Sequence, residues 1–148
     1  MVDAIKTPLN TDEFLTSIEQ FYFAYRAFTA HPDKLLAQRG LGRVHHRILY
    51  FVGRKPAMPV SALQETLQVS KQALNAPLRQ LMAMKLVVAV AAPRDRRVKE
   101  LSLTEKGKQL EQQLTATQIQ HLDKVFKTSG RKAAMNWQQV MQKMSDTT

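Results

Sequence analysis

The amino-acid sequence predicts a mainly α-helical fold that carries one small β-hairpin. Three observations lead to this prediction. Apolar residues recur with helical spacing at both ends of the chain, two short helical segments joined by a brief turn lie near its middle, and two β-prone runs follow with a turn between them. The chain has 148 residues, enough for one domain with a substantial core, so we expect residues 1–148 to form a single domain.

The first helix is expected to begin after Asn10, because Glu13, three residues later, completes a capping-box pattern. Six of the ten aromatic residues of the chain follow on this helix, at positions 14, 21, 22, 23, 25 and 28. They are more than one helix stripe can bury against a small core. An ordinary core helix is the alternative, but we favour a helix that also buries one face against a second subunit.

Two further helices are expected at the C-terminal end. The first is capped by Thr104, and the second follows Ser129–Gly130. Their apolar faces consist of Leu110, Leu114, Leu122 and Phe126 in the first helix and of Ala133, Trp137, Val140, Met141 and Met144 in the second. We expect residues 10–32 and 108–146 together to form a helical dimerisation module.

The segment between these helices, residues 34–107, has a different pattern. A helix that starts near Leu41 should end near Gly53, and a short helix should follow from Val60 to Thr66. The turn 67–69 then leads to Ser70, a good N-cap for a helix from Lys71 to about Met84. Two short helices joined by so brief a turn form the helix-turn-helix pattern.

A β-hairpin is expected directly after these helices. The runs Val87–Ala92 and Val98–Leu103 flank the turn Pro93–Arg97. A lone hairpin is marginally stable in water, so it must lean on the preceding helices, which gives the winged-helix arrangement. Its cationic residues are suited to contact phosphates or a narrow minor groove. They are Arg94, Arg96, Arg97 and Lys99.

The positive charge of the chain is concentrated in this middle segment. Fifteen basic and four acidic residues lie from Lys34 to Lys108, which gives a net charge of +11. Seven basic and eight acidic residues lie in the two ends, which gives −1. A basic middle between nearly neutral ends indicates a dedicated polyanion-binding unit rather than a uniformly solvated surface.

Three stretches of the sequence resemble the MarR family of bacterial transcriptional regulators. They are LGRVHHRILYFV at 41–52, VSKQALNAPLRQLMAMKLV at 69–87, and DRR followed by VKELSLTEKG at 95–107. The resemblance implies a homodimeric repressor with residues 34–107 as its winged helix-turn-helix DNA-binding lobe. It also implies binding to a pseudo-palindromic operator and release by a small effector. The alternative is a winged-helix module that binds nucleic acid without sequence preference, or one that binds a protein partner.

The resemblance also assigns residues to the DNA interface. Those of the recognition helix are Ser70, Lys71, Gln72, Asn75 and Arg79. Gln72 is the favoured base contact, because a glutamine can read an adenine edge with two hydrogen bonds. Asn75 and Arg79 could instead contact phosphate or solvent. In the wing, Arg97 matches the arginine that enters the groove and Asp95 the acid that supports it; the alternative for Asp95 is a plain turn residue.

Pro77 departs from the pattern of a regular recognition helix. It removes a backbone donor and crowds the carbonyl four residues earlier, at a cost of roughly 3 kcal/mol in a regular helix. We therefore expect the helix to bend at Pro77 or to split into two pieces.

An effector site is expected on the helix that leads into the lobe. The resemblance suggests that His45, His46 and Tyr50 contact a small aromatic or carboxylate ligand. The alternatives are a core role for His45 and a surface or phosphate-facing role for His46, beside Arg43 and Arg47. No metal site is expected, because the four histidines include no pair spaced i, i+4 on one helix.

Several functional classes are not supported by the sequence. The chain has no cysteine, which excludes disulfides and thiolate metal sites within it. It also lacks a phosphate loop, a nucleophile elbow and paired carboxylates, so we expect no catalytic residues, no enzyme activity and no cofactor. No apolar run could span a membrane and no secretory signal is evident, so we expect a cytoplasmic protein without a membrane partner.

Overall fold

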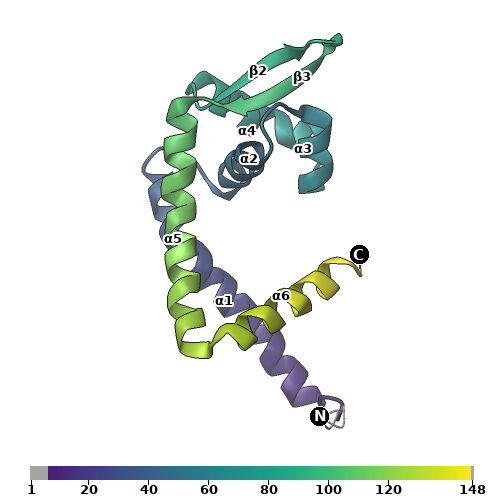
Figure 1. Cartoon of the computed structure of the whole chain (residues 1–148), viewed down its shortest axis with the longest axis vertical. Coiled ribbons are helices and arrows are strands. Elements are labelled where there is room, and N and C mark those ends of the chain that lie inside the picture. Colours follow the sequence, from purple (N-terminus) through teal and green to yellow (C-terminus); the bar gives the residue numbers. More distant parts are fainter. Residues whose placement is uncertain (1–6, 148) are drawn as a thin grey trace.

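The computed structural model describes residues 7–147 and confirms the mainly helical fold with a small sheet. In Figure 1 a lobe containing α2, α3, α4 and the sheet lies at one end of the molecule. Helices α1 and α6 lie towards the other end, and α5 runs from the lobe to α6. The chain therefore separates into a lobe and a set of terminal helices, and these names are used below.

Helix α1 spans Thr11–Ala37 and begins at the expected capping box. The Asn10 side chain accepts a hydrogen bond from the Glu13 backbone N–H at 2.9 Å, and the Glu13 carboxylate accepts one from the Asn10 N–H at 3.2 Å. The helix continues through Pro32 to Ala37, so it extends beyond the segment 10–32 that is expected in the dimerisation module. Burial of Pro32 and Leu36 holds this last part of α1 against the lobe.

The three helices of the lobe are α2 at Arg43–Arg54, α3 at Val60–Leu67 and α4 at Lys71–Ala83. Helix α3 ends at Gln68, which adopts the left-handed conformation. Ser70 then caps α4, because its hydroxyl accepts a hydrogen bond from the Ala73 N–H at 3.0 Å. Helix α4 runs unbroken through Pro77, so the expected division into two pieces is wrong.

The sheet contains one strand more than expected among the described residues. Its order is β1-β3-β2, with β1 at Met58–Pro59, β2 at Val87–Ala92 and β3 at Asp95–Leu103, all antiparallel. The turn is only two residues, 93–94, because β3 already begins at Asp95. An irregularity between Ala91 and Ala92 accommodates this longer strand. Pro59 is tolerated because β1 lies at the edge of the sheet.

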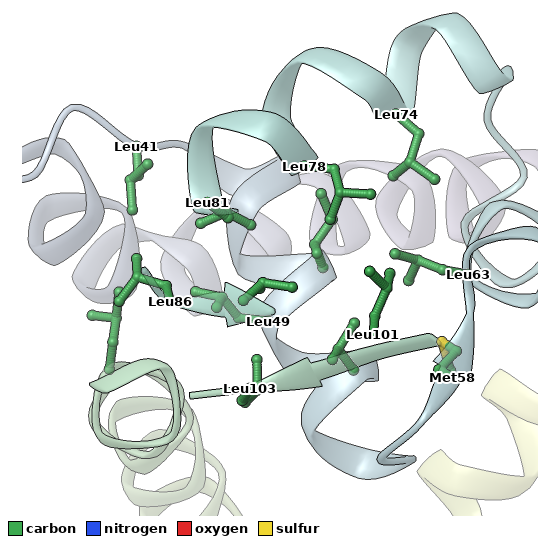
Figure 2. Close-up of a cluster of buried hydrophobic side chains, with 14 of the residues drawn as sticks. Leu41, Leu49, Met58, Leu63, Leu74, Leu78, Leu81, Leu86, Leu101 and Leu103 are labelled. Atoms are coloured by element: carbon green, nitrogen blue, oxygen red, sulfur yellow. The ribbon is translucent and has the colours of Figure 1, made fainter. Parts of the chain in front are cut away.

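One apolar core joins the lobe helices to the sheet. Figure 2 shows leucines of α4 facing Leu49 of α2 and the side chains of β3. Leu36 of α1 and two leucines of α5 belong to the same buried cluster. Each such side chain contributes about 1.5–3 kcal/mol on burial, so this cluster is the main source of stability in the lobe. The leucines that are at most 1% exposed are Leu36, Leu49, Leu63, Leu74, Leu81, Leu86, Leu101 and Leu114.

Helix α5 spans Glu105–Ser129 and starts directly after the sheet. Thr104 caps it, as expected, by accepting a hydrogen bond from the Gly107 N–H at 3.0 Å. A Cβ atom at Gly107 would lie 2.0 Å from the carbonyl oxygen of Leu86. Only glycine therefore allows the first turn of α5 to pack against the start of β2.

Helix α6 spans Arg131–Ser145 and packs on the end of α5. The rings of Phe126 and Trp137 meet edge to face, with centroids 5.7 Å apart. Helix α6 contains no buried residue, although its apolar face follows the expected spacing. None of the helices within residues 7–147 is both long enough and apolar enough to cross a membrane.

Candidate nucleic-acid interface

The first turns of α4 present polar side chains to solvent. Lys71, Gln72 and, farther along the helix, Arg79 are exposed, and no side chain of these three forms a hydrogen bond or an ion pair within the described part of the chain. Asn75 is half-buried, between the exposed face and the buried Leu74. Backbone N–H groups and the helix dipole favour anions at this end of α4. This surface can therefore meet both the edges of bases and a phosphate.

Asp95 holds Arg97 at the tip of the wing. The two carboxylate oxygens of Asp95 accept hydrogen bonds from Arg97 Nε at 3.1 Å and Nη2 at 3.2 Å. The backbone N–H of Arg97 donates a third, at 3.0 Å. These hydrogen bonds, first from the guanidinium and then from the backbone, lower the pKa of Asp95. Asp95 is therefore a charged partner of Arg97, and it also makes the backbone contact of an Asx-turn.

The wing remains cationic despite this ion pair. The Arg97 side chain is 90% exposed, so its remaining N–H groups face solvent. Arg94, Arg96 and Lys99 are also exposed. Figure 1 shows the hairpin of β2 and β3 projecting beyond the helices of the lobe. The wing thus offers several unpaired positive groups and one arginine with a fixed orientation.

A cavity of about 380 Å³ lies where α1, α2 and α5 meet. Two polar contacts between α1 and α2 lie on one side of the cavity. Arg43 of α2 forms an ion pair with Asp33 of α1 at 2.9 Å, and Arg47 of α2 donates a hydrogen bond to the Tyr25 hydroxyl of α1 at 2.9 Å. The Arg43 guanidinium also lies 5.2 Å from the centroid of the Tyr25 ring. The apolar side consists of Phe28, Phe51, Ile119 and Leu122.

Two of the three residues expected at an effector site line this cavity. They are Tyr50 and His46, and His46 is half-buried beside Arg43 and Arg47. Burial lowers the pKa of His46; the nearby charges of Glu111 and Asp33 oppose this shift, and that of Arg47 adds to it. His45 does not line the cavity, because it is buried in the lobe with hydrogen bonds to Gly42 and Gln80. The structure therefore does not bring His45 together with His46 and Tyr50 at this cavity.

The sequence interpretation missed the other polar residues of the cavity. Arg43 and Arg47 share a helix face with His46 and Tyr50, and this spacing was visible in the sequence. Tyr25 and Asp33 come from α1 and could not be assigned, because only the fold brings α1 against α2. The described residues contain no group of three or more His, Asp or Glu side chains placed to hold a metal ion.

The terminal helices expose a large apolar surface. Large apolar side chains in the N-terminal part of α1 are between 49% and 66% exposed, and those of α6 are similar. They include Phe14, Leu15, Ile18, Phe21, Tyr22 and Phe23 of α1 and Trp137, Val140 and Met144 of α6. Contiguous apolar surface of this kind typically marks a contact with another protein surface.

Comparison with known proteins agrees with this arrangement. Residues 39–98 match the model of the MarR family. The HTH-type transcriptional regulator PetP of Rhodobacter capsulatus is 42% identical over 137 residues, which cover 92% of this chain and 82% of PetP. The crystal structure of the regulator BldR from Sulfolobus solfataricus has a TM-score of 0.69 at 18% identity, over 94% of this chain and 99% of BldR. A mutant of S. aureus MepR bound to an oligodeoxyribonucleotide has a TM-score of 0.62 at 17% identity, over 93% of this chain and 98% of MepR.

Proposed function

Because the chain belongs to the MarR family of helix-turn-helix transcriptional regulators, we propose that it recognises a specific DNA operator with α4 and the wing. Lys71 and Gln72 enter the major groove, and Ser70, Asn75 and Arg79 contact flanking bases or phosphates. The arginines of the wing and Lys99 contact the adjacent minor groove or its phosphates. The solved complex of MepR with an oligodeoxyribonucleotide supports this class of partner.

The observation that carries the proposal is the Asp95–Arg97 pair at an exposed tip. An exposed ion pair contributes little to stability, so stability alone does not account for this arrangement. Fixing a long side chain before binding reduces the entropy that is lost on binding. The pair leaves part of the guanidinium free, and a preoriented arginine is suited to a narrow groove of negative potential.

The proposal includes a homodimer formed by the terminal helices. The exposed apolar side chains of α1 and α6 are a surface that a second copy can cover. Two copies related by a twofold axis present two lobes, which suits a pseudo-palindromic operator with half-sites about one helical turn, roughly 34 Å, apart. Occupation of a promoter by such a dimer leads to repression.

The cavity is proposed to bind the effector that releases the DNA. Arg43, Arg47 and the two tyrosines supply cationic and hydroxyl groups, and the aromatic side chains supply an apolar wall. This lining is suited to an aromatic carboxylate. Benzoate serves as a probe in calorimetry, and Arg43→Ala should weaken its binding if the carboxylate contacts this guanidinium.

Selection of bound fragments from genomic DNA tests the proposed function. A selected duplex is labelled and displaced with unlabelled copies of itself or with random duplex in a gel-shift assay. An operator-specific regulator resists the random competitor, since specific binding is typically about 10³-fold or more tighter than non-specific binding. Equal displacement by both competitors favours the alternative, a module that binds nucleic acid without sequence preference.

A further inference from the structure

A chain of hydrogen bonds connects the recognition helix to the turn between α1 and α2. The Gly42 N–H donates to His45 Nδ1 at 2.9 Å, and His45 Nε2 lies 2.8 Å from Gln80 Oε1. The Gln80 side-chain amide donates to the carbonyl oxygen of Gly40 at 3.3 Å. His45 belongs to α2 and Gln80 to α4, so these contacts join three segments of the lobe.

The hydrogen-bond partners fix the form of His45. An Nδ1 atom that accepts from a backbone N–H carries no proton of its own, so this geometry assigns the ring N–H to Nε2. That proton is then available to the Gln80 carbonyl oxygen, and the other end of the amide remains free to donate to Gly40. Every donor in this chain faces an acceptor. His45 is buried and Gln80 is exposed, so breaking the contact between them leaves His45 Nε2 poorly satisfied, whereas the Gln80 amide can bond to water.

The remaining contacts of α4 with the lobe are mostly apolar. Leu74, Leu78 and Leu81 bury one face of the helix in the core, and such apolar contacts are less directional than hydrogen bonds. Pro77 also leaves the Ala73 carbonyl without its usual donor within the helix. The hydrogen bonds of Gln80 are therefore a directional contact that helps to orient the C-terminal half of α4.

The other end of this series of hydrogen bonds lies in the turn between α1 and α2, where α1 leads into the lobe. Gly40 has a φ of +71°, and Gly42 is the N-cap residue of α2. His45 accepts a hydrogen bond from the backbone N–H of this N-cap residue and so stabilises the turn. The His45 side chain also contacts Gln80, so it connects α4 to the turn that joins the lobe to the terminal helices.

We propose that His45 and Gln80 are positioning residues that hold α4 in one rotation relative to the turn between α1 and α2. Neither residue contacts DNA in this proposal. Their effect is to present Lys71 and Gln72 to the major groove in a single orientation. The inference rests on the proposed function, because it concerns the selectivity of operator recognition.

The test compares operator selectivity, measured as the ratio of the dissociation constants for random duplex and for a selected operator. Gln80→Met removes both hydrogen bonds and keeps the side-chain length. It should lower the ratio by about tenfold, the effect of one misplaced base contact, and leave the affinity for random duplex within about twofold. Gln80→Glu keeps an acceptor for His45 and should restore most of the ratio. Gln112→Met, an exposed glutamine of α5, is the matched control.

His45→Asn tests the same contact from the other side. An asparagine can still accept from the Gly42 N–H but cannot reach Gln80, so it should lower selectivity as Gln80→Met does. The double variant should be no worse than either single variant, because both break one connection.

Three outcomes overturn the inference. One is an unchanged selectivity ratio in Gln80→Met and His45→Asn. Another is a parallel loss of affinity for operator and random duplex, which indicates partial unfolding of the lobe. A third is a wild-type protein that does not distinguish operator from random duplex, in which case the proposed function fails as well. If the wild type is selective and the variants remain so, only the positioning role fails.

Discussion

The lobe and the terminal helices differ in where their large apolar side chains lie. In the lobe, leucines from three helices and the sheet are almost fully buried in one cluster. In α1 and α6, aromatic and aliphatic side chains of similar size remain widely exposed. Helix α5 belongs to both regions, with Leu110 and Leu114 buried in the lobe and Val125 exposed near α6.

This difference indicates two sources of stability in one chain. The lobe buries its apolar surface within itself, so its folding free energy comes mainly from internal contacts. The terminal helices leave comparable surface exposed, and association with a second copy is the proposed way to bury it. Substitutions in the core of the lobe should therefore lower the free energy of unfolding, and substitutions on the exposed face of the terminal helices should weaken association.

The largest effect is expected when a buried side chain in the core of the lobe is shortened. Leu49→Ala removes a fully buried side chain of α2 and should lower the free energy of unfolding by about 2–5 kcal/mol. Val88→Ala alters an exposed side chain of the same lobe and should change it by less than about 0.5 kcal/mol. Urea denaturation followed by circular dichroism at one protein concentration measures both. Similar losses in the two variants would contradict an internally stabilised lobe.

The next largest effect is expected on dimer formation. Phe21→Asp places a charge on the exposed apolar face of α1 and should weaken dimerisation by about 2 kcal/mol or more, roughly thirtyfold in dissociation constant. Val88→Asp is a matched control, because Val88 is 43% exposed and Phe21 is 49% exposed. Sedimentation equilibrium over a range of concentrations measures the dimer. A wild-type monomer at micromolar concentration, or equal weakening by both changes, would exclude the proposed interface.

A smaller effect is expected when one positive charge is removed from each region. Arg97→Ala should weaken operator binding by at least ~1 kcal/mol and leave the dimer intact. Arg131→Ala removes an exposed arginine from α6 and should leave binding almost unchanged. Gel-shift titration at fixed salt concentration gives both affinities. Equal losses would indicate a general effect of net charge instead of a contact at the wing.

The smallest effect is expected in the pH dependence of stability. The pKa of His46 is lowered by burial, so the unfolded chain takes up this proton at a higher pH than the folded chain does. The contribution of neutral, buried His46 to the free energy of unfolding is fully present above about pH 6.5. It is lost as the pH falls towards the lowered pKa of the folded protein. His46→Gln should remove this part of the acid sensitivity, and His31→Gln, at an exposed position of α1, should retain it. Thermal unfolding from pH 7.5 to 5 compares the three proteins.

Local signals in the sequence predicted much of the fold. Asn10, Ser70 and Thr104 each cap a helix with a contact three residues away, so a short stretch of sequence contains the whole signal. Strand β1 was missed because its two residues are stabilised by pairing with Leu101 and Glu100, far along the chain. The continuation of α4 through Pro77 also depends on distant contacts, since buried leucines precede and follow the proline.

The candidate site also combines features with a local sequence signal and features that depend on distant contacts. The exposure of Lys71 and the pairing of Asp95 with Arg97 depend on residues within a few positions, and sequence patterns indicated both features. Their roles in DNA binding remain predictions. The contact between His45 and Gln80 joins residues 35 positions apart, and the ion pair of Asp33 with Arg43 crosses between two helices. Such contacts follow from packing and have no local signature.

The stiffness of helix α5 has a consequence for the spacing of the two lobes in the proposed dimer. After Gly107 it contains neither glycine nor proline, and its 25 residues form a stiff rod about 37 Å long. Its first turns are fixed in the lobe by Leu110 and Leu114. A tilt of only about 10° at its far end shifts the lobe by about 6 Å, nearly two base-pair steps of ~3.4 Å each. In the proposed dimer, small changes in the angle between the two α5 helices would thus change the fit of the two lobes along the duplex.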